Sequence, residues 1–437
     1  MKHFTVLLLF LLVGSFLIID SSHAQTDTKL TSQVVDLREG PGAYYPLVVR
    51  VMESQPVTVL KSEENWSQVR VNAQTGWLPG YLLKSQEAET SSDNKPKRDS
   101  PFDRMDKVFG KSSDKTKDSS ATASPAEIAA AVKGFSDNYK SRSQGKYPLA
   151  ARAITPAHNF SLDLRGYRQF LNERGTDIQR RNRHREIKLK KINTPAMNSR
   201  VNTIGYAIAQ HVARQHGIYE DKELQTYLTY IAQSLVESSH RVELPVQVYV
   251  LDSDDVLGYA VPGGYIFMSK GALKSMNNEA HAAHFLAHEI AHLVQGHGEE
   301  HYKNNEHVIR KDRAISKLDR LVETDEKHKQ TVKDLSVMAD RIRDYLNRDE
   351  LDSYELDADY WGMIYMSRAR YHPFESVAYL KQNLIKRGDL PKASKAMWNG
   401  AKLETRIKKL EKEIRKQGQY PGNILEDEFL SYQRRLK

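Results

Sequence analysis

The chain has 437 residues, with 65 lysines and arginines against 56 aspartates and glutamates, and a formal net charge of +9. It contains no cysteine, which excludes stabilisation by disulfides and anchoring by cysteine lipidation. A chain of this length can bury the cores of two domains, so we expect a multidomain protein that rests on apolar packing and bound metal.

Residues 1–24 have the features of a secretion signal. Lys2 precedes an apolar run from Phe4 to Ile19, and Ser22-His23-Ala24 offers small residues at the positions that a signal peptidase reads. We expect cleavage after Ala24 and a periplasmic or secreted product; the alternative is an uncleaved N-terminal anchor. No later apolar stretch is long enough to cross a bilayer, so we expect no transmembrane span after cleavage.

Residues 27–85 predict a small all-β barrel, because short β-rich runs alternate there with Gly, Pro and Asn turns. The order of Leu37-Arg38-Glu39-Gly40-Pro41-Gly42, a central Val-Thr-Val-Leu, and Gly76-Trp77-Leu78 resembles bacterial SH3-like domains. The resemblance implies contact with cell-wall material or peptides through residues 30–84. Trp66, Trp77 and Tyr81 are candidates for that surface, and the alternative is that the two tryptophans are core residues.

Two segments separate this barrel from the rest of the chain. Residues 86–124 are rich in Ser, Lys, Asp and Thr and predict a flexible linker, so we expect the barrel to move independently. Residues 125–199 predict a helical, basic pre-domain, starting at Ser124-Pro125. Its basic cluster, between 174 and 191, predicts a solvated helix face or a contact with envelope polyanions; export argues against nucleic acid. The cluster comprises Arg180, Arg181, Arg183, Arg185, Lys188, Lys190 and Lys191.

The segment His288-Glu289-Ile290-Ala291-His292 lies in an apolar stretch that runs from Ala280 to Val294. Positions i and i+4 of a helix face the same side, so the two histidines can hold one Zn²⁺, with Glu289 directed towards the same cleft. Such a five-residue pattern also arises by chance. A buried His-Glu-His without a partner would be costly, however, so we predict one zinc per chain.

The third ligand must come from another segment. Glu355 is the candidate, because Asp359 follows four residues later and can orient a ligand histidine from behind. The fourth position is left for water, whose pKa zinc lowers to about 7. Glu289 can then act as the general base in attack on a carbonyl carbon.

These motifs, with Pro262-Gly263-Gly264 upstream and Lys270-Gly271-Ala272-Leu273, resemble the HtpX/BepA-like gluzincin metallopeptidases, relatives of the CAAX prenyl proteases, over about residues 200–415. The resemblance implies that His288, His292 and Glu355 are ligands and Glu289 the base. It also implies an active-site edge strand from Gly264 to Ser269, on which a peptide substrate pairs with the main chain around Gly263, Gly264, Tyr265 and Ile266.

Two segments depart from the pattern of that family. Gly258-Tyr259-Ala260 stands where Asn-Ala-Phe-Ala is usual, and the segment from Trp398 to Arg406 lacks a His-Pro that often precedes an Arg. Between the two halves of the metal site, residues 299–350 carry apolar residues at helical spacing among many charges. They predict a charged helical hairpin that acts either as a lid or as scaffold.

The sequence therefore predicts a small SH3-like barrel followed by a mainly α-helical (α+β) gluzincin domain at residues 200–437. The expected function is an exported zinc endopeptidase that acts on unfolded envelope proteins, in quality control, without nucleic-acid partners. An envelope chaperone or wall-binding adaptor with a silent metal site is one alternative, and a cell-wall amide hydrolase is another.

Overall fold

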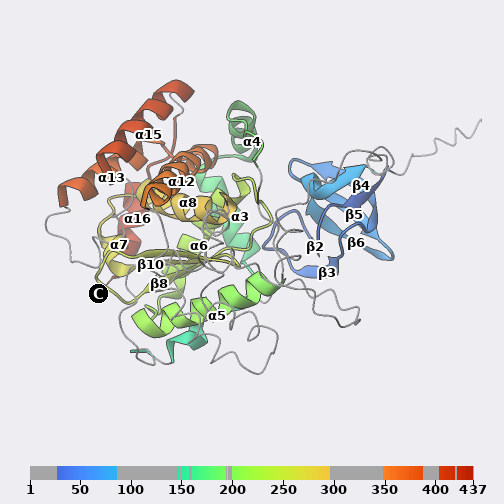
Figure 1. Ribbon diagram of the computed structural model, residues 1–437, viewed down its shortest axis with the longest axis horizontal. Coiled ribbons are helices and arrows are strands. Elements are labelled where there is room, and N and C mark those ends of the chain that lie inside the picture. The colour runs from blue at the N-terminus through green and yellow to red at the C-terminus, as the bar shows by residue number, and fades with distance from the viewer. Residues whose placement is uncertain are drawn as a thin grey trace, which may run out of the picture.

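The computed structural model describes residues 27–85, 146–147, 149–156, 160–192, 194, 199–295, 348–386, 403–418 and 421–436. The predicted signal peptide and linker lie outside this range, as do the first part of the pre-domain and the predicted hairpin up to residue 347. Within the range, the chain forms a small barrel and a larger helical domain (Figure 1).

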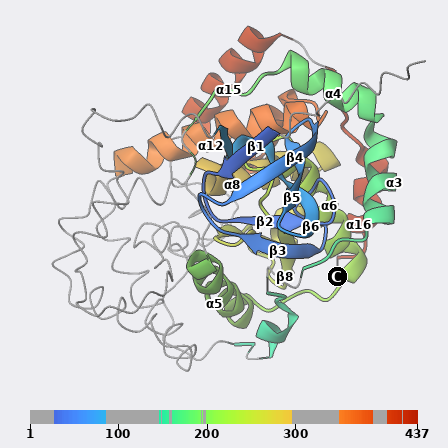
Figure 2. The same cartoon turned by 90° about the vertical axis from the view of Figure 1, so that its right-hand side faces the viewer.

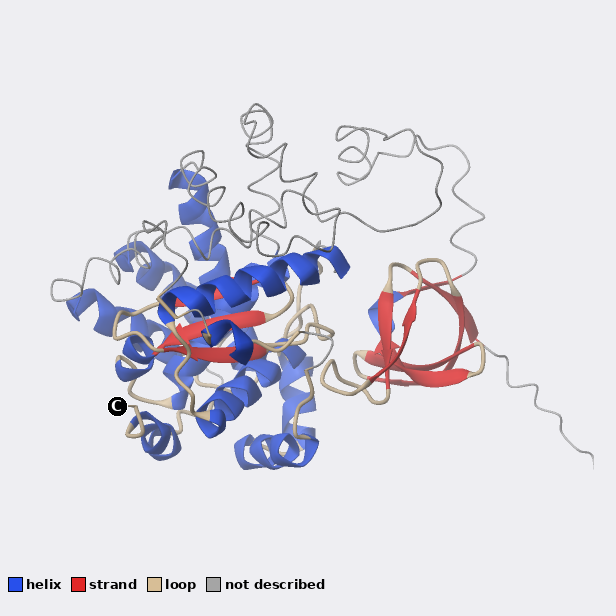
Figure 3. Ribbon diagram, turned by 90° about the horizontal axis from the view of Figure 1, so that it is seen from below, coloured by secondary structure: helices blue, strands red, loops and turns tan. Residues whose placement is uncertain are grey.

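The barrel is a curled, seven-stranded antiparallel sheet, as predicted, with the strand order β3-β2-β6-β5-β4-β1-β7 (Figure 3). Alternation of apolar and polar residues directs Val35 and Leu37 of β2, and Val69 and Val71 of β5, into one core. Its elements are β1 (Asp27–Thr31), β2 (Val35–Arg38), β3 (Leu47–Val51), β4 (Pro56–Glu63), β5 (Trp66–Val71), β6 (Gln74–Pro79), the 3-10 helix η1 (Gly80–Leu82) and β7 (Leu83–Ser85).

The three aromatic residues proposed for the barrel's binding surface have different surroundings. Trp66 is only 7% exposed, so it is a core residue. Trp77 is half-buried, whereas Tyr81, on η1, is 49% exposed. A continuous surface made of all three side chains is therefore absent from the barrel.

The second domain is helical with one small sheet, as predicted. Figure 3 shows the sheet enclosed by helices. Among the residues that the structure describes, no helix is both long and apolar enough to span a membrane. The elements are η3 (Ala150–Ala153), α3 (Leu164–Arg174), α4 (Asp177–Glu186), α5 (Ser199–His216), α6 (Lys222–Glu237), β8 (Gln247–Leu251), β9 (Gly258–Val261), β10 (Tyr265–Ser269), α7 (Lys270–Lys274), α8 (Glu279–Gln295), α12 (Arg348–Arg368), α13 (Phe374–Lys386), α15 (Leu403–Gln417) and α16 (Glu426–Gln433).

The strand order of the small sheet corrects one prediction. The order is β8-β10-β9, so the strand from Tyr265 to Ser269 is the middle strand and not the edge. β10 pairs parallel with β8 on one side and antiparallel with β9 on the other. Because both sides of β10 are already paired, the edge strands are β8 and β9, and β9 packs against α8.

Two arginines of the basic pre-domain helices are buried and hydrogen-bond to distant parts of the chain. Arg183 of α4 is buried and donates hydrogen bonds to the carbonyl oxygens of Ser367 (3.2 Å) and Pro421 (2.7 Å). Arg174 of α3 is also buried, and its Nε donates to Glu279 Oε1 at 2.6 Å. Arg181, Arg185 and Lys188 are exposed, as expected for a solvated face. The basic cluster is therefore partly a set of internal cross-connections.

We expect Arg174→Met to destabilise the protein strongly. Glu279, at the start of α8, is fully buried, and it accepts hydrogen bonds from Tyr227 and Tyr371 as well as from Arg174. Removal of the arginine leaves a buried carboxylate without its countercharge, which costs about 3–5 kcal/mol of unfolding free energy. Urea unfolding measures this, with the exposed Arg185→Met as the matched control. An equal effect of both substitutions would contradict the assignment.

The barrel lies against the helical domain (Figures 1 and 2). Arg168 of α3 donates a hydrogen bond to the hydroxyl of Tyr45 at 3.1 Å, and Arg181 of α4 faces Glu64 at 3.7 Å. These contacts oppose the expectation that the barrel moves independently of the rest.

Candidate metal centre

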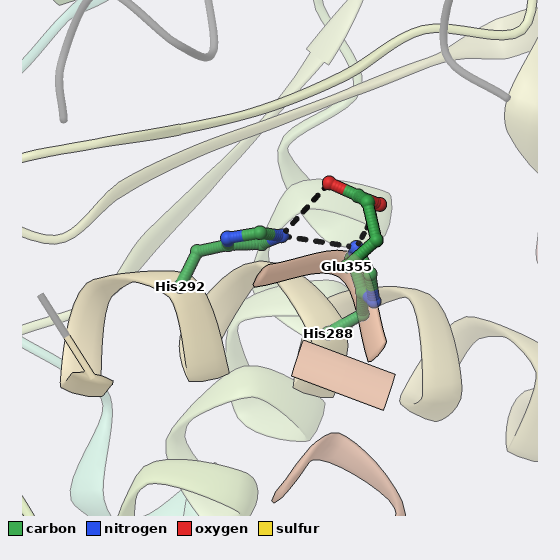
Figure 4. Close-up of side chains that lie close together, drawn as sticks. All are labelled: His288, His292 and Glu355. Carbon is green, nitrogen blue, oxygen red and sulfur yellow. Dashed lines mark hydrogen bonds and ion pairs between the residues drawn. The ribbon is translucent and has the colours of Figure 1, made fainter. Parts of the chain in front are cut away.

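The predicted ligands converge on one point between α8 and α12. His288 and His292 project from adjacent turns of α8, and Glu355 approaches them from α12 (Figure 4). The Nε2 atom of His288 lies 3.3 Å from Glu355 Oε2, and that of His292 lies 3.5 Å from Glu355 Oε1. The two Nε2 atoms are 3.2 Å apart.

This arrangement fits a divalent cation such as zinc. In a tetrahedral site with metal–ligand bonds of about 2.0–2.1 Å, neighbouring ligand atoms lie about 3.3 Å apart. The three observed separations of 3.2, 3.3 and 3.5 Å agree with that spacing. Two imidazole nitrogens and one carboxylate oxygen are also a donor set that zinc favours, and they leave one position open. Among the described residues, this is the only such group of three.

Close packing of α12 on α8 brings Glu355 to the histidines. Ala287 of α8 and Ala358 of α12 are both fully buried, and Gly362 of α12 lies against the backbone of Ala287. At Gly362, an added Cβ would lie 3.0 Å from the backbone nitrogen of His288. Glycine at this position therefore lets α12 run directly over the turn of α8 that carries the first histidine.

Asp359 contacts the ring nitrogen of His288 that lies away from His292 and Glu355. Its Oδ1 lies 3.0 Å from His288 Nδ1, so the carboxylate can accept the Nδ1 proton and leave Nε2 facing the site. Asp359 is 1% exposed. Its partner on the other side is Arg406 of α15, whose Nε and Nη2 donate to the two carboxylate oxygens at 2.6 and 2.7 Å.

Arg406 is the site residue that the sequence interpretation missed. It is 3% exposed, and its Nη1 also lies 3.5 Å from Glu355 Oε2, so it contacts the carboxylates of both Glu355 and Asp359. A signal was present in the sequence. On α15 the buried positions are Leu403, Arg406, Ile407, Leu410 and Ile414, and an arginine within an otherwise apolar stripe indicates a buried charged partner.

The charges of the site are strongly coupled. Burial alone would raise the pKa of Asp359, but the adjacent Arg406 and His288 hold it well below its usual range. Burial alone would lower the pKa of His288, but its hydrogen bonds to Asp359 and Glu355 raise it to about 9. The two carboxylates thus favour positive charge between the helices, carried either by a proton or by a bound cation.

Glu289 is half-buried on α8 between the two histidines, and its negative charge contributes to raising the pKa of Arg406. Two further histidines lie on the same helix. His281 Nε2 lies 3.1 Å from Glu375, and burial lowers the pKa of His284 to about 3. Both are directed into the packed interior and lie outside the metal-binding group.

The residues predicted for the substrate strand occupy a turn and the middle strand. Gly263 and Gly264 form the β9–β10 turn with φ of +86° and +85°. A Cβ on Gly264 would collide with the backbone of Pro245, so the turn requires glycine there. Tyr265 and Ile266 pair with Val261 and Ala260 of β9. The segment predicted to bind substrate, Gly263 to Ile266, therefore pairs with the edge strand β9 and is not itself an edge strand.

Comparison with known proteins relates both domains to known families by sequence. Residues 222–414 match the model of peptidase family M48, and residues 33–84 match the bacterial SH3 domain. The beta-barrel assembly-enhancing protease of Yersinia pestis is 30% identical over 77 residues, which are 18% of this chain and 16% of the relative. That of Escherichia coli K12 is 26% identical over 80 residues, with the same coverage.

A putative beta-barrel assembly-enhancing protease of Vibrio cholerae is 27% identical over 93 residues, 21% of this chain and 19% of the relative. The matches thus span less than a fifth of the length of these relatives and support the domain, not the whole protein. The chain combines a bacterial SH3 domain with a metallopeptidase domain of family M48.

Proposed function

We propose that this protein is a zinc-dependent endopeptidase that cleaves unfolded proteins of the bacterial envelope. The observation that carries the proposal is the convergence of His288, His292 and Glu355 within a domain of family M48. The names of its relatives and the signal-like N-terminus support an exported protease of envelope quality control. Zinc is the proposed metal because of the nitrogen-rich donor set.

Each residue of the site has a role in this proposal. Bound zinc would supply a Lewis acid that polarises the scissile carbonyl and acidifies a water molecule. Glu289 accepts the proton of the attacking water and returns it to the leaving amine. Asp359 fixes the tautomer of His288, and Arg406 keeps Asp359 ionised and in place.

The substrate is proposed to bind along β9. This strand stands at the edge of the sheet and packs against α8, which carries the metal ligands. An extended chain can add to such an edge by main-chain pairing, whereas a folded protein cannot present the required strand. A preference for unfolded substrates follows from this geometry. β9 takes the role that the sequence resemblance implied for the strand from Gly264 to Ser269.

Chelation tests the function. We expect the mature protein to contain about one zinc per chain and to cleave casein into fragments. Treatment with 1,10-phenanthroline should abolish cleavage, and a stoichiometric amount of Zn²⁺ should restore it. The matched substrates are a stably folded protein of similar size and purified cell-wall sacculi, both of which should remain intact.

The two alternatives give different results in the same assay. Release of wall fragments without casein cleavage would support a wall amide hydrolase. Suppression of aggregation without cleavage of any substrate, and unaffected by chelation, would support a chaperone with a silent site. Either result would overturn the peptidase proposal.

A further inference from the structure

Three tyrosines of the barrel face the peptidase domain. Tyr44 and Tyr45 lie in the β2–β3 loop, and Tyr81 lies on η1. The ring of Tyr44 packs edge-on against Tyr167 of α3, with centroids 5.2 Å apart, and joins the core of the peptidase domain. Tyr45 accepts the hydrogen bond from Arg168, and the hydroxyl of Tyr81 donates to Glu243.

The loop is built to present these rings. Tyr44 and Tyr45 stack on each other at 5.0 Å. A Cβ on Gly40 would collide with the ring of Tyr45, and one on Gly42 would lie 2.6 Å from the ring of Tyr44. The two glycines of the Gly40-Pro41-Gly42 turn therefore leave the space in which the tyrosine rings fold over the loop.

The barrel does not need these tyrosines for its own core. The main cluster of that core consists of buried aliphatic residues, and neither Tyr44, Tyr45 nor Tyr81 belongs to it. The buried face of Tyr44 packs instead on the other domain. Aromatic residues of one domain that pack on another are typical of a binding interface.

Glu237, at the end of α6, completes the contact from the side of the peptidase domain. Burial raises the pKa of its carboxyl to about 7, while the hydroxyls of Tyr167 and Tyr44 and the charge of Arg180 lower it. The charge of Glu64, from the barrel, raises it. Tyr44 of the barrel and Tyr167 of α3 therefore act on the same carboxyl, as expected if the two surfaces fit together.

The contact also lies beside the proposed substrate strand. Tyr81 holds Glu243, and two residues further along the chain Pro245 packs against Gly264 of the β9–β10 turn. The backbone nitrogen of Gln247 donates to the carbonyl oxygen of Gly264 at 2.9 Å. β9 runs from Gly258 towards this turn, so a peptide that lies along β9 is directed towards the barrel beyond Val261.

We propose that Tyr44, Tyr45 and Tyr81 clamp the SH3 barrel onto the peptidase domain, where the barrel forms an end wall beyond the proposed substrate strand β9. The second part rests on the proposed function; the first does not. The partner of this barrel surface is thus the peptidase domain of the same chain. While the barrel is docked, the hydroxyl of Tyr81 is engaged with Glu243.

The clamp can be tested by distance measurement on the full mature chain. Because the chain has no cysteine, Lys61→Cys and Arg185→Cys provide two exposed sites for spin labels, one on each domain. We expect one narrow distance distribution, and a broad one when Tyr44→Ala and Tyr81→Ala are added. Leu60→Ala, an exposed apolar residue of β4, is the matched control and should keep the narrow distribution. Circular dichroism checks that each variant is folded.

A broad distribution before any tyrosine is replaced would overturn the clamp, and so would a narrow one that survives both replacements. Cleavage tests the end wall separately. In the Tyr44→Ala/Tyr81→Ala variant, we expect casein cleavage to fall about fivefold or more, as for truncation of interface aromatics, with short peptides unaffected. An unchanged ratio of casein cleavage to short-peptide cleavage would overturn the end wall alone. If no variant cleaves any substrate, the proposed function fails, while the distances still decide the clamp.

Discussion

Replacement of Glu289 by glutamine is expected to abolish peptide cleavage while zinc stays bound. Glutamine has nearly the same shape, but its amide cannot accept a proton from water, so the general base is lost. Turnover of casein should fall by about 10²- to 10⁴-fold. Zinc content should remain at about one per chain, because Glu289 lies outside the group of three ligand atoms.

Glu355→Ala is the matched variant on the opposite helix. It removes a carboxylate that faces both histidines at 3.3 and 3.5 Å, so both zinc and activity should be lost. Elemental analysis and casein cleavage on the two variants separate binding from chemistry. Full activity of Glu289→Gln would contradict the assigned mechanism, and normal zinc content of Glu355→Ala would contradict the assigned ligands.

Substitution of Arg406 by leucine is expected to weaken zinc binding without touching a ligand. The guanidinium holds Asp359 through two hydrogen bonds, and Asp359 in turn orients His288. Loss of such a supporting contact lowers metal affinity by about 10- to 100-fold. The uncompensated Asp359 carboxylate, which is 1% exposed, should also cost about 3–5 kcal/mol of unfolding free energy.

Competition with a chromophoric chelator measures the affinity, and urea unfolding of the metal-free protein measures the stability. Arg415→Leu, at an exposed position of the same helix, is the control and should change neither. Arg406→Lys should give an intermediate affinity, because lysine keeps the charge but lacks the two-pronged geometry. Unchanged zinc affinity in Arg406→Leu would show that Asp359 orients His288 without the arginine.

The convergence of His288, His292 and Glu355 was predictable because its signal is local. The spacing of His288 and His292 is one helical turn, and the apolar residues between Ala280 and Val294 require that helix to be buried. Glu355 and Asp359 are likewise one turn apart and therefore face the same side of α12. Local spacing alone does not show that the two helices pack against each other. The family resemblance implied that contact.

Features that depend on strand order and domain docking were not predictable in the same way. Nothing in the run from Tyr265 to Ser269 says whether it has one neighbour or two, because pairing with β8 involves residues about 18 positions earlier. The docking of Tyr44 on Tyr167 joins segments more than a hundred residues apart. Arg183 shows the same limit, since its basic neighbours are exposed and its own buried position follows from tertiary packing.

The most direct test of the metal centre is an anomalous difference map at the zinc absorption edge, from crystals of the protein grown with Zn²⁺. One peak per chain should lie between His288 Nε2, His292 Nε2 and Glu355, about 2.0–2.2 Å from each ligand atom. Ordered zinc at any other group of residues, with no peak between α8 and α12, would contradict the account.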